Sequence, residues 1–145
     1  ELVSFQTFMT GELFALLSGQ SVLRHSVAAD GWDDTAFAKA VDAAISRPQA
    51  IAAKLFGLRA EALLDGLDGA TARARLSGLL IGIELAAAKP YWLGQRVALI
   101  GDAALCARYA EALAAQGLQP EHTNADEMTL AGLSAAYASL EEISS

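Results

Sequence analysis

The sequence predicts an α/β fold that is rich in helices and contains a small sheet. Three observations support this prediction. Residues 96–117 read RVALIGDAALCARYAEALAAQG, a short apolar run that breaks at Gly101-Asp102 and continues with the apolar spacing of a helix. Residues 10–88 carry mainly helical patterns. A second short strand pattern at 118–122 gives the later half of the chain the order α-β-α-β-α.

The chain is expected to begin with a short strand over residues 2–8. A helix follows, with Thr10 as its N-cap and Gly19 at its end. The apolar residues of this helix are Leu13, Phe14, Leu16 and Leu17.

Two further helices are predicted before residue 65. Asp33 or Asp34 caps a helix over residues 35–46, and Pro48, which ends it, suits the first turn of the next helix. That third helix carries Ile51, Leu55, Leu58, Leu63 and Leu64, with Gly57 as a weak point.

A long helix is predicted over residues 70–88, after a loop at 65–69 and before Pro90. Small residues recur along it every four positions and form a strip that lets another backbone approach closely. We expect this strip to pack densely against a neighbouring element. Its members are Ala70, Ala74, Gly78, Gly82 and Ala86.

The stretch at 97–117 is the centre of the predicted sheet. Residues 97–100 are expected to form a strand buried on both faces, Asp102 to cap the following helix, and Gly117 to end it. Ligands bind at such carboxyl ends of strands in open α/β sheets, although an ordinary capped connection explains the same residues. Residues 118–122 are expected to form an edge strand, and Asp126 to cap the last helix.

Composition restricts the function. Hydrophobic residues make up 54% of the 145 residues, and 10 basic against 17 acidic residues give a net charge of −7. This excess of acid disfavours nucleic acids and anionic membranes as partners. The single cysteine, Cys106, is expected to be a buried apolar residue in a cytoplasmic protein, and neither histidine has the neighbours of a metal site.

Three segments resemble a known family when taken in order. They are SFQTFMTGELF at 4–14, LSGLLIGIE at 76–84 and LAGL at 130–133, with RVALIGDAAL at 96–105 between the last two. Together they resemble 2-dehydro-3-deoxygalactonokinase, a family of bacterial sugar-acid kinases in the hexokinase/actin-like superfamily. The resemblance covers the whole chain but only the C-terminal half of such a kinase.

This resemblance implies the helix-rich half of a ribonuclease-H-like (actin-like ATPase) fold, as a single domain over 1–145. The intact enzyme is expected to transfer the γ-phosphoryl group of ATP to the 6-hydroxyl of 2-dehydro-3-deoxy-galactonate with Mg²⁺. The epimeric gluconate remains open as a substrate, and so does homo-oligomerisation. The family's two phosphate-binding loops are absent from the sequence, and the chain begins with Glu1 inside a strand pattern. We therefore expect a fragment that is inactive without the N-terminal half.

The resemblance also implies site residues. Gly101, Asp102, Ala103 and Leu105 are expected to form the adenosine-side loop of the nucleotide site. For Asp102, the N-cap role is the competing interpretation.

A substrate site is expected at Thr10, Gly11 and Glu12, with the carboxylate of Glu12 near a sugar hydroxyl or Mg²⁺-bound water. A simple helix cap explains the same three residues. The catalytic base is not identified.

Three further charged residues are candidate ligand contacts. Glu84 lies in an apolar run and needs a partner, while Arg73 and Arg75 could reach an anionic ligand or stay in solvent.

Two alternatives to the kinase remain. One is a non-catalytic helical module for interaction or oligomerisation. The other, a Rossmann-like cofactor protein, is disfavoured because GDAALC lacks the glycine spacing of that fold.

Overall fold

The computed structural model describes residues 3–143, and these residues divide into two compact units that meet at Leu93 and Gly94. The first unit is helical. Its elements are α1 (Thr10–Gly19), the 3₁₀ helix η1 (Val22–His25), α2 (Asp34–Ser46), the 3₁₀ helix η2 (Pro48–Ala50), α3 (Ile51–Leu64), α4 (Gly69–Ala87) and α5 (Lys89–Trp92). The second unit contains β1 (Ala98–Gly101), α6 (Ala103–Ala115), β2 (Glu121–Asn124) and α7 (Ala125–Ile143).

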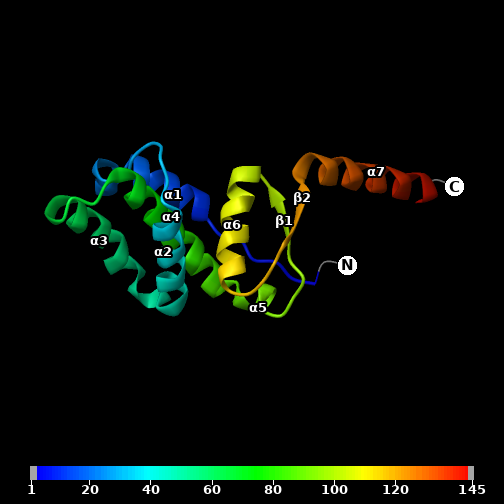
Figure 1. The fold of residues 1–145 in the computed structure, drawn as a ribbon. Helices are drawn as coiled ribbons and strands as arrows, with labels where there is room; N and C mark the ends of the chain where they lie inside the picture. The colour runs from blue at the N-terminus through cyan, green and yellow to red at the C-terminus, as the bar shows by residue number, and fades with distance from the viewer. Residues whose placement is uncertain (1–2, 144–145) are drawn as a thin grey trace. The chain divides into compact units, whose positions relative to one another are not determined.

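Helix α4 is the centre of the helical unit. It contacts α1, α2 and α3, which gather around it in Figure 1. A helix that packs on several sides cannot keep a single apolar face, and nine residues of α4 are buried. The core that results includes Leu58, Leu76 and Leu80, each at most 2% exposed.

The strip of small residues does bring two backbones together. A Cβ atom on Gly78 would lie 2.5 Å from the carbonyl oxygen of Phe37, and one on Gly82 would lie 2.7 Å from that of Val41. Real side chains do not approach so closely, so glycine is required where α4 crosses α2. The predicted dense packing is confirmed.

Side-chain caps define where several helices begin. Asp33 accepts a hydrogen bond from the backbone N–H of Ala36 at 2.9 Å, which confirms one of the two predicted caps of α2. The carboxylate of Asp68 accepts from the N–H of Thr71 at 3.0 Å and starts α4. Hydrogen bonds to the carboxylate, above all the one from the Thr71 backbone and then one from the Thr71 side chain, hold the pKa of Asp68 below its usual value.

The strand predicted over 2–8 is wrong for the residues that the structure describes. Residues 3–9 have no regular secondary structure, and Val3 and Phe5 are largely exposed. A strand needs a neighbour for its backbone groups, and the two described strands pair with each other. Residue 2 lies outside the described residues.

The second unit is a β-α-β unit followed by α7. Strands β1 and β2 are parallel, with Ala98 opposite Glu121 and Gly101 opposite Asn124. Helix α6 is the crossover between them and ends before Gly117, whose φ of +83° suits glycine and confirms the predicted stop.

Two expectations for this unit are corrected. The first strand is not buried on both faces, since Ile100 is 57% exposed. Burial on both faces needs a layer on each side of the sheet, and the helices that contact this strand leave Ile100 uncovered. The last helix is capped by Asn124, whose side-chain oxygen accepts from the N–H groups of Asp126 and Glu127, and not by Asp126 itself. The second strand also begins later than predicted, just after Pro120.

Candidate functional site

The first turn of α1 holds the three residues predicted to bind substrate. Thr10 is the first residue of the helix and not its cap, and its hydroxyl donates a hydrogen bond to the carboxylate of Glu84 on α4. Gly11 and Glu12 follow it and are exposed. The structure therefore brings together Thr10 and Glu84, which lie 74 positions apart and were both candidate site residues.

The N-terminus of α1 carries no side-chain cap. Met9 is the residue that precedes the helix, and no side chain there accepts a hydrogen bond from the N–H groups of the first turn. The predicted cap by Thr10 is therefore wrong. The reason is that the Thr10 hydroxyl is engaged by Glu84 instead of by the backbone. Uncapped N–H groups of a first turn favour hydroxyl or anionic groups of a ligand.

The turn from β1 to α6 holds the residues predicted to bind the nucleotide. Asp102 Oδ1 accepts a hydrogen bond from the backbone N–H of Leu105 at 3.0 Å, so Asp102 is the cap of α6. Ala103 lies in the first turn, and the side chain of Leu105 is 53% exposed. This set belongs to the second unit and the Thr10 set to the first.

Gly101 is not required by the fold of the second unit. Its φ is not in the left-handed region, and a Cβ atom there would lie 3.6 Å from the sulfur of Cys106, an ordinary contact. Cys106 itself is buried, as predicted. The fold of the second unit therefore gives no reason for a glycine at this turn, and the nucleotide contact predicted there stays a prediction.

The two arginines of α4 are held by the protein. The guanidinium of Arg73 donates to the backbone oxygen of Ala28 at 3.3 Å and lies 5.1 Å from the centre of the Phe14 ring. Arg75 forms a bidentate ion pair with Glu61 of α3, in which its two terminal nitrogens lie 2.5 and 2.8 Å from the carboxylate oxygens. Neither side chain is simply solvated.

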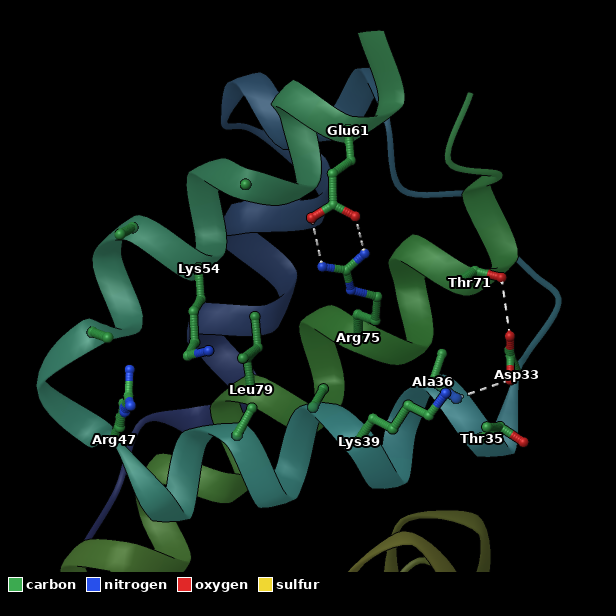
Figure 2. A pocket seen from close by; sticks show the side chains of 15 residues that line it. Asp33, Thr35, Ala36, Lys39, Arg47, Lys54, Glu61, Thr71, Arg75 and Leu79 are labelled. Atoms are coloured by element: carbon green, nitrogen blue, oxygen red, sulfur yellow. Dashed lines mark hydrogen bonds and ion pairs between the residues drawn. The ribbon is translucent and has the colours of Figure 1, made fainter. Parts of the chain in front are cut away.

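A pocket of about 720 Å³ lies between α2, α3 and α4. Figure 2 shows charged side chains from all three helices around it. Alanine side chains of α2 and α3 make room for the cavity. The charged residues at its wall are Asp33, Lys39, Arg47, Lys54, Glu61 and Arg75.

Both acidic groups of the pocket are already engaged. Arg75 donates hydrogen bonds to Glu61, which lowers the pKa of the Glu61 carboxyl and raises that of the Arg75 guanidinium. Asp33 accepts from the Ala36 N–H and, at 3.2 Å, from the Thr71 hydroxyl. The remaining charge of the pocket is therefore positive.

Sequence reasoning missed this pocket, although its residues follow helical spacing. Lys39 and Ala43 are four positions apart along α2, and Arg47 follows four positions later, just after the helix ends. Thr71, Arg75 and Leu79 are four positions apart along α4. Such spacing places each set on one side of its helix. What the sequence lacks is the information that these two sides face each other.

Two absences concern the described part of the chain. Within it, no three His, Cys, Asp or Glu side chains lie close enough together to hold a metal ion. None of the helices there combines the length and the apolar character that crossing a bilayer requires.

The chain is similar to known sugar-acid kinases. A sequence model of the family 2-keto-3-deoxy-galactonokinase matches residues 1–136. The chain is 43% identical over 136 residues to a protein of Rhizobium meliloti (strain 1021) named as a probable 2-dehydro-3-deoxygalactonokinase, covering 91% of this chain and 44% of that protein. It is 32% identical over 134 residues to the 2-dehydro-3-deoxygalactonokinase of Escherichia coli (strain K12), covering 92% and 46%.

A solved structure agrees with these similarities. The crystal structure of a candidate 2-dehydro-3-deoxygalactonokinase from Sinorhizobium meliloti matches with a TM-score of 0.84 and 42% identity, over 94% of this chain and 45% of that one. The chain thus spans slightly less than half the length of the proteins that it matches.

Proposed function

Because the chain belongs to the 2-keto-3-deoxy-galactonokinase family, we propose that it is part of an ATP-dependent sugar-acid kinase. The reaction proposed is transfer of the γ-phosphoryl group of ATP to the 6-hydroxyl of 2-dehydro-3-deoxy-galactonate. The observation that carries this proposal is the family match over residues 1–136, supported by relatives at 43% and 32% identity that carry the name of this kinase.

The chain is proposed to supply the C-terminal half of the kinase, as the helix-rich half of a ribonuclease-H-like (actin-like ATPase) fold. The parallel β1-α6-β2 unit is compatible with such a fold. Phosphoryl transfer depends on positioning and on neutralising charge around both reactants. We therefore propose that the N-terminal half is the essential partner and that this chain alone does not turn over.

The β1–α6 turn is the proposed nucleotide contact. Asp102 places a carboxylate at the N-terminus of α6, where it disfavours a phosphate group by charge repulsion. The turn therefore suits the uncharged adenosine part of ATP, with the backbone of Gly101 against the ligand and Ala103 and Leu105 beside it.

The first turn of α1 is the proposed substrate contact. The hydrogen bond from Thr10 fixes the carboxylate of Glu84 and leaves the exposed Gly11 and Glu12 to meet the ligand. A carboxylate such as that of Glu12 accepts hydrogen bonds from sugar hydroxyls.

In phosphoryl transfer Mg²⁺ is held by one or two carboxylates together with the phosphates of the nucleotide. The described residues contain no group of three His, Cys, Asp or Glu side chains that could hold a metal ion. We assign no metal ligand to this chain.

The activity is tested by ADP release from the whole kinase in which this chain occurs. Turnover is expected with ATP and 2-dehydro-3-deoxy-galactonate, with the gluconate epimer as the comparison, and none from the 145-residue chain alone. Turnover by the chain alone would contradict the need for a second half. No turnover by the whole protein would contradict the proposed kinase activity.

The nucleotide contact is tested in the same whole kinase. Gly101→Val is expected to raise the KM for ATP while KM for the sugar acid stays unchanged. Ala98→Val, on the same strand but away from the turn, is the control and is expected to leave both unchanged. An unchanged KM for ATP in a folded Gly101→Val enzyme would remove Gly101 from the site.

A further inference from the structure

The pocket between α2, α3 and α4 concentrates positive charge in an acidic protein. The chain has a net charge of −7 and 10 basic residues, yet four of those ten line this one pocket. Solvated lysines and arginines repel one another when they gather in a cavity, so such a cluster needs a counter-charge. The pocket lies outside the two sets of residues used for the proposed kinase site.

Protein groups supply only part of that counter-charge. Glu61 is neutralised by Arg75 on the facing helix, whereas Asp33 accepts hydrogen bonds from two uncharged donors and keeps its single negative charge. Within the described part of the chain, the charged groups of Lys39, Arg47 and Lys54 have neither an ion-pair nor a hydrogen-bond partner. With four basic and two acidic residues at its wall, the pocket therefore keeps a net charge of +2 for a ligand.

The cations stand at two places along the pocket. Arg47 and Lys54 lie at one end of it in Figure 2, and Lys39 lies nearer the end formed by Asp33. Arg47 directly follows the last residue of α2 and lies eight positions after Lys39, which separates their Cα atoms by roughly 12 Å. One compact anion does not fill both places, whereas an elongated molecule with an acidic group at each end does.

The size and lining of the pocket fit a small organic molecule. A volume of about 720 Å³ is within the range of ligand sites, and alanine side chains leave space for a carbon skeleton between the charged ends. A phosphate carries between −1.5 and −2 charges and matches the paired Arg47 and Lys54, while a carboxylate matches the single Lys39.

We propose that this pocket binds a phosphorylated organic acid, with its phosphate between Arg47 and Lys54 and its carboxylate at Lys39. The product of the proposed kinase reaction has this chemistry, and to that extent the choice of ligand rests on the proposed function. The pocket would then give the kinase a second place at which a phosphorylated acid is held, lined by none of the residues of the proposed substrate contact at the first turn of α1.

Calorimetric titration of the 145-residue chain at low ionic strength tests the site without ATP and without turnover. The probes are 6-phosphogluconate, gluconate and inorganic phosphate, which carry both acidic groups, the carboxylate alone and the phosphate alone. We expect 6-phosphogluconate to bind at least ten times more tightly than either of the others. Equal affinity for 6-phosphogluconate and free phosphate, or no binding of either, would overturn the proposal.

Single substitutions locate the two ends of the ligand. Lys54→Gln is expected to weaken both phosphate probes by about tenfold or more, because it removes one charge-assisted hydrogen bond. Lys39→Gln is expected to weaken 6-phosphogluconate equally but to leave free phosphate unchanged. Lys89→Gln, which removes the same charge outside the pocket, is the matched control and is expected to change neither affinity.

Lys39 is exposed and Lys54 is half-buried, and circular dichroism of each variant checks that it folds. If Lys54→Gln and Lys89→Gln weaken binding alike, the attraction is general and the site is wrong. If the whole protein shows no kinase activity but the probes bind as expected, only the proposed function is refuted. If the kinase activity is found but the probes do not bind as expected, only the proposed pocket ligand is refuted.

Discussion

Gly78→Ala is expected to destabilise the helical unit because it forces α4 away from α2. The added Cβ atom would lie 2.5 Å from the carbonyl oxygen of Phe37 and 2.9 Å from the Cβ of Ala40. Ordinary contacts begin at 3.4 Å, so the two backbones would have to separate by about 0.9 Å. They belong to the pair of helices with the most extensive contact in the chain, and neither clashing atom is on a flexible side chain.

The expected loss follows from two opposing effects. Overpacking of this kind costs about 3 kcal/mol at the upper end of its usual range, while replacing glycine by alanine inside a helix gains about 1 kcal/mol. The net decrease in the free energy of unfolding is therefore about 2 kcal/mol. Gly57→Ala on α3 is the matched control, since its Cβ would meet only the flexible end of Glu61 at 3.8 Å.

Urea unfolding followed by circular dichroism measures both variants. Gly57→Ala is expected to raise the midpoint, with a gain of about 0.5–1 kcal/mol, and Gly78→Ala to lower it with an unchanged slope. A Gly78→Ala protein as stable as the Gly57→Ala protein would refute the close approach of α2 and α4.

Three further predictions concern polar contacts, each measured by the same unfolding assay. Asp102→Ala removes the cap of α6 and is expected to cost about 1 kcal/mol; an unchanged stability would mean that the cap contributes nothing. Thr10→Val keeps the shape of the side chain but removes a donor from Glu84, and is expected to cost about 1–2 kcal/mol, whereas Thr10→Ser should retain most of the stability. Glu61 has a lowered pKa in the folded protein, so its ion pair with Arg75 stabilises the fold above pH 4.5, and this contribution is lost as the pH falls below that value. Glu61→Gln should flatten this acidic part of the profile of unfolding free energy against pH. A profile identical to that of the unsubstituted protein would exclude the ion pair as its cause.

Local sequence signals predicted the helices well. The boundaries of α2 and α4 follow from short polar residues at their starts, and Asp33 and Asp102 cap their helices as their positions before apolar spacing indicated. Gly117 ends α6 because glycine alone adopts its backbone conformation without strain. Each of these features depends on neighbours within a few residues.

Features that depend on distant partners were predicted poorly. Residues 3–8 alternate like a strand, but a strand exists only with a partner to accept its hydrogen bonds. Thr10 has the chemistry of a cap, yet a carboxylate 74 positions away takes its hydroxyl. The same limit hid the pocket, since three separate helices contribute its charges. The assignments at Gly101 and at Gly11 stay predictions.

The central place of α4 also has a consequence for synthesis on the ribosome. Helices α1, α2 and α3 precede α4 in the chain, and the core of the helical unit is built on the buried residues of α4. When residue 64 has emerged, the earlier helices still lack α4, whose buried residues complete the core that they share. At ordinary rates of translation, residues 65–87 take about 1–5 s to follow, and for that interval the nascent chain exposes apolar surface that chaperones recognise.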